Sequence, residues 1–367
     1  MNMAGEQTKG RKWDHLNICS VEDVQARKVK TGFEDVRLIH DALPDLDLAS
    51  IDTSTDFLGF RFGFPMIISA MTGGTEEAER INASLAEAAG ELNLGICVGS
   101  QRAALEDPSL ERTYRVVREK APDAFISANI GCSQLRSDRR TEMARSAIEM
   151  IEANALTIHL NSLQEAVQPE GETTFTGVLA QIEEVVHDLK VPTIVKETGA
   201  GVARREAEAL KRIGVHAVDV AGAGGTSWAA VEYYRARVRG DRPRTRLGLT
   251  FWDWGIPTAI SLIECSQLEG LTLVASGGLR SGLDIAKSIA LGATISGIAL
   301  PLLRPAIEGA AKVLEEIRIL VSELRTAMFL TGSQNIQSLK RAPLVITGEV
   351  AEWADLSNLD LRKYARR

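Results

Sequence analysis

The chain has 367 residues, of which 45% are hydrophobic and 25% are charged, and this is the composition of a globular protein with a sizeable core. Its formal net charge of -7 argues against nucleic acid as a partner, because nucleic-acid binding requires a positive face. The sequence has no stretch apolar enough for a membrane span and no signal-peptide pattern, so we expect no membrane partner and a cytoplasmic location.

The cysteines are widely separated along the chain. They form no Cys-x-x-Cys pair, and no histidine spacing completes a zinc site. We therefore expect reduced, mostly buried thiols and no structural metal. The positions are Cys19, Cys97, Cys132 and Cys265.

The N-terminal segment is polar and then basic. Residues 1–10 are predicted to be mobile. Arg11, Lys12 and His15 place three potential cations within one or two helical turns, and a solvated tail is the ordinary interpretation of such a cluster. From Arg27 on, the segment is predicted to be irregular and to close the bottom of the domain that follows.

A repeating pattern begins at residue 65, where a short apolar segment is followed by a polar or glycine turn and then by helical spacing. This alternation occurs eight times and predicts an α/β fold, a (β/α)₈ TIM barrel with an N-terminal arm and a C-terminal extension. The insertion between Arg235 and Pro257 is predicted to fold over the mouth of the barrel. The predicted strands are 65–70, 94–98, 124–128, 155–158, 192–195, 217–220, 271–275 and 293–300. The predicted arm with barrel-bottom segment, barrel and C-terminal appendage span 1–64, 65–325 and 326–367.

Polar side chains follow most of these strands at the point where each strand ends. The carboxyl ends of parallel strands meet on one face of a barrel, and that face carries the active site in this architecture. A purely structural role would scatter polar residues over both ends. The predicted face contains Thr72, Ser100, Arg102, Asn129, His159, Asn161, Lys196, Thr226 and Arg280.

The last two strands flank a candidate phosphate site. Gly277 and Gly278 permit a tight turn, Ser281 can cap the following helix, and Arg280 adds a positive charge. An ordinary strand-to-helix turn would have the same residues, so the motif alone leaves both interpretations open.

Three further residues have both a chemical and a structural interpretation. Glu165 is suited to hold one Mg²⁺ together with water and substrate oxygens, or it interacts with a helix dipole. Lys196 can place a positive charge beside an electron-rich ring, or it pairs with Glu197 or Asp219. His159 on an apolar strand is by itself more typical of a buried core histidine.

The chain resembles the type 2 isopentenyl diphosphate isomerases in motifs that span about Arg11 to Gly348. HLNSLQE is the most specific of them, because other flavin-binding barrels share the glycine turns but not that loop. In order, the motifs are RKWDHL, AMTGG, GSQR, ANIG, HLNSLQEAVQPEGE, VKETGAG, VAGAGGTSW, FWDWGIPT, ASGGLRSGLD and IALP.

This resemblance implies an FMN-dependent enzyme of isoprenoid biosynthesis that interconverts isopentenyl and dimethylallyl diphosphate. It implies a requirement for Mg²⁺ and for NADPH or NADH as the reductant of the flavin. It also implies a homo-oligomer, a tetramer or an octamer, in which the Arg-Lys arm reaches a neighbour's site.

The resemblance further implies which residues act. FMN would be lined by Ala70, Met71, Thr72, Ser100, Asn129, Lys196, Ala221, Thr226, Gly278, Leu279, Arg280, Ala299 and Leu300. Substrate would meet Arg11, Lys12, Ser100, Gln101, Arg102, His159, Asn161 and Gln164, with Glu165 on the metal. The catalytic set would be Gln164, Lys196, His159 and Asn161.

The chemistry of the reaction agrees with such a site. Moving the double bond requires one proton delivered to an alkene carbon and another removed from an allylic carbon, with no net redox change. Our hypothesis is that reduced flavin serves as acid and base, Gln164 orients or relays, and Lys196 stabilises negative charge on the ring. The diphosphate would be neutralised by Arg11, Lys12, Arg102, His159 and the metal.

Two alternatives share much of this pattern. A hydroxy-acid oxidase or dehydrogenase on the same barrel would carry out net oxidation and would need no metal. A non-catalytic barrel that binds flavin or phosphate would hold the cofactor without isomerising an alkene.

Overall fold

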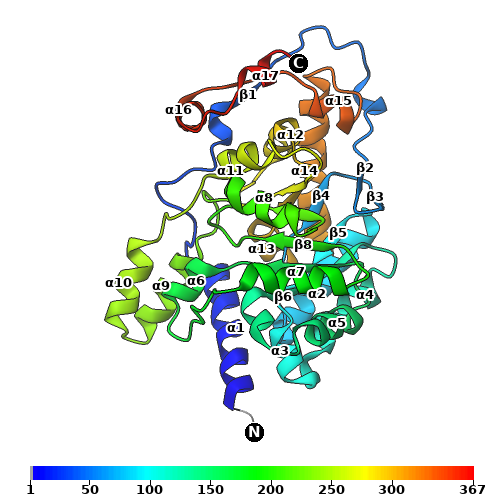
Figure 1. The fold of residues 1–367 in the computed structure, drawn as a ribbon. Coiled ribbons are helices and arrows are strands. Elements are labelled where there is room, and N and C mark those ends of the chain that lie inside the picture. The colour runs from blue at the N-terminus through cyan, green and yellow to red at the C-terminus, as the bar shows by residue number, and fades with distance from the viewer. Residues whose placement is uncertain (1–2) are drawn as a thin grey trace.

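The computed structural model describes residues 3–367, and side-chain exposure from residue 10 onward. Its centre is a closed barrel of eight parallel strands in the order β10-β11-β4-β5-β6-β7-β8-β9 (Figure 1). The pairing of Gly297 with Ile67 joins the last strand to the first, which confirms the predicted (β/α)₈ barrel. The strands are β4 (Met66–Ile68), β5 (Gly95–Cys97), β6 (Ile126–Gly131), β7 (Ala155–His159), β8 (Thr193–Lys196), β9 (Ala217–Asp219), β10 (Thr272–Ala275) and β11 (Ile295–Ile298).

The helices that follow the strands bury one face each against the barrel. In α2, Thr75 caps the first turn by accepting a hydrogen bond from the Ala78 amide, and Ile81 and Leu85 are buried. Burying each such aliphatic side chain contributes about 1.5–3 kcal/mol. The surrounding helices are α2 (Glu76–Glu91), α4 (Arg112–Lys120), α5 (Arg140–Met150), α7 (Val178–Asp188), α8 (Arg204–Arg212), α11 (Thr258–Cys265), α12 (Gly282–Leu291) and α14 (Ala310–Phe329).

A hairpin of β2 (Thr55–Phe57) and β3 (Phe60–Phe62) fills the amino end of the barrel. The rings of Phe57 and Phe62 pack against Phe125, with centroid separations of 5.7 and 5.6 Å. They belong to a buried cluster that includes Ile67 and Ile194 from the strands. The hairpin thus keeps water out of the end of the barrel opposite the predicted site.

Residues 26–31 lie at the other end of the barrel, which corrects the expectation that everything from Arg27 to Phe64 closes the bottom. The Ala26 amide donates to the Gly225 carbonyl at 2.8 Å, and the Ala259 amide donates to the Thr31 carbonyl at 2.8 Å. Three amides in 27–29 donate to Asp253 Oδ1. These contacts anchor the segment beside the glycine-rich loop after β9.

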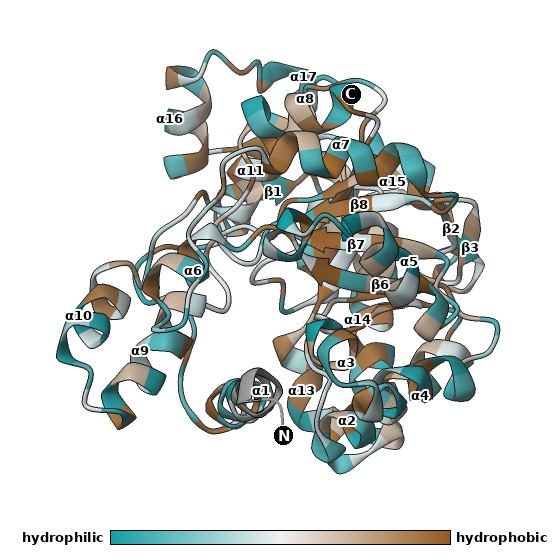
Figure 2. Cartoon of the chain, turned by 60° about the horizontal axis from the view of Figure 1, so that its bottom comes forward, coloured by the Kyte–Doolittle hydropathy of each residue, from teal (hydrophilic) through white to brown (hydrophobic). Residues whose placement is uncertain are grey.

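Helix α1 (Met3–Val21) replaces the mobile tail expected for residues 1–10, although Met1 and Asn2 lie outside the described residues. Figure 2 shows α1 between α9 (Trp228–Val238) and α13 (Leu300–Glu308). It also contacts α3 (Arg102–Glu106). Its sequence has no apolar stripe, so its position depends on these tertiary contacts rather than on its own pattern.

The insertion after Arg235 completes α9 and forms α10 (Arg242–Thr250), which packs against α9. No residue of 235–257 lines the main cavity, so the prediction that this insertion folds over the mouth is wrong. Trp252 is buried against Tyr233 and Tyr234, whereas Trp254 is 62% exposed. The insertion supports α9 from outside.

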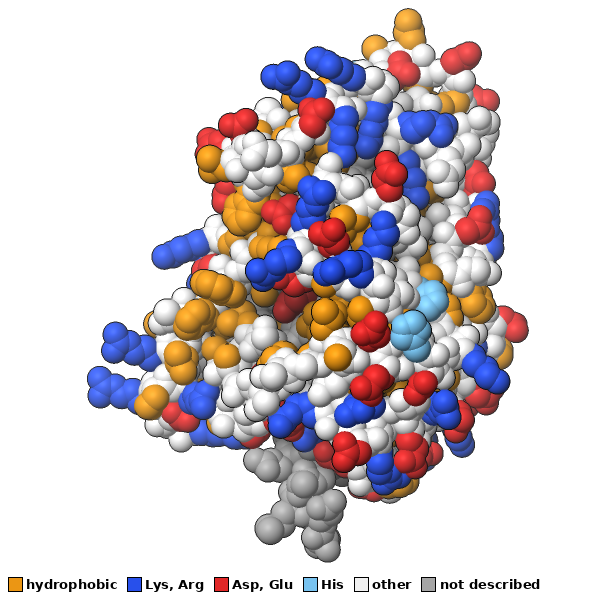
Figure 3. Space-filling model, in the orientation of Figure 1, with side chains coloured by type: hydrophobic (Ala, Val, Ile, Leu, Met, Phe, Trp, Pro, Cys, Tyr) orange, Lys and Arg blue, Asp and Glu red, His pale blue; other side chains and the backbone are white. Residues whose placement is uncertain are grey.

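The C-terminal residues pack beside the barrel through an antiparallel pair, in which Val36 opposes Ile346. Acidic and basic side chains are interspersed over the face in Figure 3, without a continuous basic surface. Within residues 3–367, no helix is both long and apolar enough to cross a membrane. The remaining elements are β1 (Val36–Leu38), α6 (Ser162–Val167), α15 (Ile336–Lys340), β12 (Leu344–Ile346), α16 (Gly348–Leu356) and α17 (Arg362–Ala365), with 3₁₀ turns at Phe33–Asp35, Leu48–Ser50, Pro108–Leu110 and Cys132–Arg136.

Candidate active site

A cavity of about 240 Å³ opens at the carboxyl ends of the strands, on the side covered by α1, α6 and α9. All but one of the residues predicted for the site line it. The lining set includes Arg11, Lys12, Ala70, Met71, Thr72, Ser100, Arg102, Asn129, His159, Asn161, Gln164, Glu165, Lys196, Ala221, Thr226, Gly278, Leu279, Arg280, Ala299 and Leu300.

Gln101 is the exception, because its side chain does not line the cavity in which the substrate contact was predicted. Its side chain is fully buried and points toward α5, where Nε2 donates to the Ala147 carbonyl at 2.8 Å. Its Oε1 accepts the Asn129 amide at 2.9 Å. Both ends of the amide are therefore occupied inside the fold, and Gln101 positions Asn129 from behind.

The glycine loops form a cradle at one end of the cavity. Gly277 and Gly278 have φ angles of 102° and 78°, which favour glycine. A Cβ at Gly277 would lie 2.2 Å from the Gly222 carbonyl oxygen, and one at Gly225 would lie 2.3 Å from the Gly278 amide nitrogen. The two loops therefore approach each other more closely than any side chain permits, and the bare backbone of Gly277 and Gly278 lines the cavity.

The start of α12 completes this cradle. Ser281 and Asp284 form a capping box, with Ser281 Oγ accepting the Asp284 amide. Arg280 donates to the Leu279 carbonyl and to Gln25 Oε1, and within the described chain it forms no ion pair. A helix N-terminus with an arginine that lacks a carboxylate partner is suited to bind an anion.

A row of registered residues crosses the floor of the cavity, because His159 pairs with Lys196 and Lys196 pairs with Asp219 in adjacent strands. Lys196 Nζ lies 3.3 Å from Asp219 Oδ2, while Glu197 accepts hydrogen bonds from the amides of its own loop. The structure thus selects Asp219 as the partner of Lys196.

His159 is neutral in this state. Its Nδ1 lies 2.8 Å from Asn129 Oδ1, and it donates there because Asn129 Nδ2 donates to the Val98 carbonyl. Burial, with the positive charges of Lys12 and Lys196, lowers the pKa of His159 to about 3. The expectation that His159 supplies positive charge to a diphosphate therefore requires that the bound anion first raise this pKa.

A cluster of cations also lines the cavity, near enough to His159 for its charges to act on that ring. Lys12 Nζ donates to the Ser100 carbonyl at 2.8 Å. Burial, together with Arg11 and Arg102, lowers the pKa of Lys12 to about 7, and burial and Arg102 lower that of Arg11. Cations that depress one another's pKa values are stabilised when an anion binds between them.

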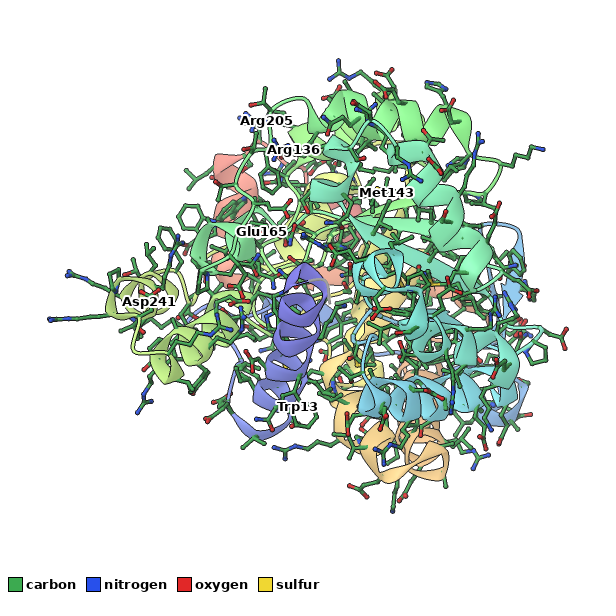
Figure 4. All side chains as sticks on the ribbon, turned by 90° about the horizontal axis from the view of Figure 1, so that it is seen from below. Trp13, Arg136, Met143, Glu165, Arg205 and Asp241 are labelled. Atoms are coloured by element: carbon green, nitrogen blue, oxygen red, sulfur yellow. The ribbon has the colours of Figure 1, made fainter. Side chains whose placement is uncertain are left out.

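Glu165 lies beside this cluster, next to α1 and on the side away from Trp13 (Figure 4). Asn161 Nδ2 donates to its Oε1 at 2.8 Å, and Gln168 Nε2 donates to its Oε2 at 2.5 Å. The other amide oxygens, Asn161 Oδ1 and Gln168 Oε1, are buried without a hydrogen-bond partner. A carboxylate beside unpartnered amide oxygens is a donor set that Mg²⁺ accepts.

Sequence reasoning missed a buried ionic network behind Gln164. Glu232 Oε1 accepts from His15 Nε2 at 2.8 Å and from Gln164 Nε2 at 3.4 Å, and Glu232 Oε2 accepts from Arg235 at 2.6 Å. Burial opposes the ionisation of Glu232, but His15 and Arg235 outweigh it and lower its pKa to about 2. The available signal was the spacing of Glu232 and Arg235, three apart on one helix face.

Comparison with known proteins agrees with this geometry. Residues 4–108 and 139–346 match the FMN-dependent dehydrogenase family. The chain is 50% identical over 358 residues to an isopentenyl-diphosphate delta-isomerase of Methanosarcina barkeri, covering 98% of this chain and 97% of the relative. It is 51% identical over 348 residues to the protein of that name from Archaeoglobus fulgidus, covering 95% and 99%.

Solved structures show the same fold at much lower identity. A mandelate oxidase variant with 2-hydroxy-phenylacetamide is 18% identical, with a TM-score of 0.63 over 94% of this chain and 97% of that one. A flavocytochrome b2 variant is 17% identical, with a TM-score of 0.64 over 95% and 89%. The chain therefore belongs to the isopentenyl-diphosphate delta-isomerases, within the FMN-dependent dehydrogenase family.

Proposed function

We propose that this protein interconverts isopentenyl and dimethylallyl diphosphate by moving protons, with FMN as its cofactor, as a step of isoprenoid biosynthesis. One observation carries the proposal. The cavity combines a glycine cradle suited to a phosphate-bearing flat cofactor with a second, separate set of cations and a metal-type carboxylate. A hydroxy acid has one carboxylate and would leave much of that second set unused.

FMN fits the cradle side of the cavity. Its phosphate would be held by backbone amides around Gly278 and by Arg280. Because the glycine loops carry no side chains, the cavity beside them has room for a planar ring near Lys196. When bound and reduced, FMN supplies an acid–base group and an electron-rich face. We propose NADPH or NADH as the reductant.

The substrate diphosphate would be bound by the cation cluster. Arg11, Lys12 and Arg102 provide positive charge, and His159 contributes after it takes up a proton. Glu165 would hold Mg²⁺, assisted by the amide oxygens of Asn161 and Gln168, and water and phosphate oxygens would complete the coordination. In the described chain no three His, Cys, Asp or Glu side chains cluster as a metal site, which fits an ion held by one carboxylate and its substrate.

Among the residues of the cavity, we propose Gln164 as the side chain that takes part in proton transfer. Its Nε2 donates to Glu232, so the amide orientation is set by a carboxylate whose low pKa keeps it ionised. An amide held in this way can orient the substrate alkene or pass a proton at its oxygen. Asn161 orients Glu165. Lys196 places positive charge at the cofactor side of the cavity.

The family likeness extends the proposal to the assembly. We propose a cytoplasmic homo-oligomer, a tetramer or an octamer. Trp13 is 47% exposed on the outer side of α1, so one face of this helix is available to a neighbouring subunit while its other face lines the cavity.

An anaerobic assay tests the function. Dithionite-reduced holoenzyme is incubated with isopentenyl diphosphate and Mg²⁺, and dimethylallyl diphosphate is measured by NMR. We expect isomerisation without net consumption of reductant. Bleaching of oxidised flavin by 2-hydroxy acids, without isomerisation, would favour an oxidase or dehydrogenase. Yellow protein inactive in both assays would indicate a non-catalytic flavin-binding barrel.

A further inference from the structure

A buried carboxylate touches three walls of the cofactor side of the cavity. Asp219 ends β9, and its side chain is 7% exposed. Its Oδ2 lies 3.3 Å from Lys196 Nζ on β8, and its Oδ1 accepts from Ser276 Oγ at 2.6 Å at the end of β10. Oδ1 also accepts the Ala221 amide at 3.2 Å.

Two of these partners, Ser276 and Ala221, stand directly before the two glycine loops of the cradle. Ser276 is followed directly by Gly277, and Ala221 begins the loop that meets it. Ala221 has a φ of 36°, which an alanine adopts only when its surroundings hold it there. Asp219 therefore ties the lysine and both glycine loops to one rigid point.

The register of the strands explains why this acid pairs with Lys196. Lys196 and Asp219 are paired neighbours in parallel strands, so their side chains leave the barrel wall on the same side. Lys196 is 13% exposed. A lysine this buried needs a nearby negative charge or a bound anion to remain favourable.

We propose that Asp219 is a positioning residue for the flavin, acting through Lys196. It fixes the ammonium group and offsets part of its charge, so that FMN faces an ion pair rather than an isolated cation. This inference rests on the proposed FMN site. It predicts that Asp219 sets the balance between oxidised and reduced flavin, since only the reduced ring gains negative charge beside the lysine.

The variant Asp219→Asn isolates the charge. The asparagine oxygen can still accept from Ser276 and Ala221, while the offset to Lys196 is lost. In the holoenzyme we expect the equilibrium to shift about tenfold toward reduced FMN, a rise of about 30 mV for a two-electron couple. We also expect the reduced flavin to become anionic at lower pH, seen in its absorbance spectrum. Asp219→Glu should restore both values partly.

Ser276→Ala is the matched variant, because it removes one hydrogen bond to Asp219 and keeps the charge. It should shift the potential by a smaller amount in the opposite direction, because the carboxylate loses a donor that disperses its negative charge and therefore offsets Lys196 more fully. An unchanged potential in FMN-bound Asp219→Asn overturns the inference. If that variant fails to fold, an unchanged potential in Ser276→Ala overturns it instead. Wild-type protein that refuses FMN would refute the proposed function, whereas bound FMN with unaltered potentials refutes only the role of Asp219.

Discussion

Arg102 and Glu172 form an ion pair across the mouth of the cavity, with Nη1 and Oε1 2.8 Å apart. The backbone amide of the same Glu172 donates to Glu165 Oε2 at 2.7 Å. Glu172 thus interacts both with Arg102, a proposed phosphate ligand, and with Glu165, the proposed metal ligand. Binding of a magnesium diphosphate must displace it from at least one of them.

Glu172→Gln should therefore strengthen the binding of inorganic pyrophosphate with Mg²⁺, measured by calorimetry. The pair is partly exposed and worth about 0.5–1 kcal/mol, so we expect roughly a two- to fivefold gain. Glu106→Gln is the control, because Glu106 also pairs with Arg102 at 2.8 Å and lies on the same helix, α3, as Arg102. Equal gains in both variants would show only a general charge effect.

Lys12 should make diphosphate binding depend on pH. Its pKa of about 7 in the free protein lies below the ordinary lysine value, and a bound anion raises it again. Binding then requires proton uptake above pH 7, and pyrophosphate affinity should fall by up to about tenfold per pH unit there. Lys12→Arg should flatten the profile, since arginine stays charged. If the fall of pyrophosphate affinity with pH is the same in Lys12→Arg, the titrating group is another residue, such as His159.

Glu165→Gln should weaken the binding of Mg²⁺. The glutamine keeps the size of the side chain but loses the charge that holds Mg²⁺, so the Mg²⁺ concentration for half-maximal activity should rise at least tenfold or activity should be lost. Glu170→Gln serves as the control, because Glu170 pairs with Arg235 and does not line the cavity. Identical Mg²⁺ titrations for wild type and Glu165→Gln would remove Glu165 as a ligand.

Gln164→Ala should retain FMN and lose about 10²–10⁴-fold in turnover, the range for a positioned proton-handling group. The measurement is kcat under anaerobic, reducing conditions, with flavin content read from absorbance. Turnover near wild type would leave Gln164 without a role in proton handling.

Gly277→Ala should abolish FMN binding, because its Cβ would lie 2.2 Å from the Gly222 carbonyl oxygen. Gly270→Ala is the matched control, since Gly270 also has a positive φ, of 74°, but has nothing within 4 Å of its Cβ position. The control should bind FMN and lose only about 1–2 kcal/mol of stability from backbone strain. Flavin retention in Gly277→Ala would show that the loops can separate without cost to the cradle.

The sequence by itself determined the barrel and the face that carries the site. Eight apolar segments alternate with helical spacing, and parallel strands necessarily end on one side. This is why the cavity contains residues as distant as Thr72, Lys196 and Arg280. Local periodicity is enough to predict the barrel, because it shows which side of each strand and helix is buried.

Only the tertiary structure decided which partner each side chain meets. Gln101 lies between two cavity residues in sequence but turns toward α5. Lys196 pairs with Asp219 rather than with the adjacent Glu197 because the strand register aligns the first two, while successive side chains along a strand point to opposite sides. The helix at Arg11 and Lys12 depends on contacts with α9 and α13 more than 200 residues away. Such pairings follow from register and long-range packing, which no local pattern contains.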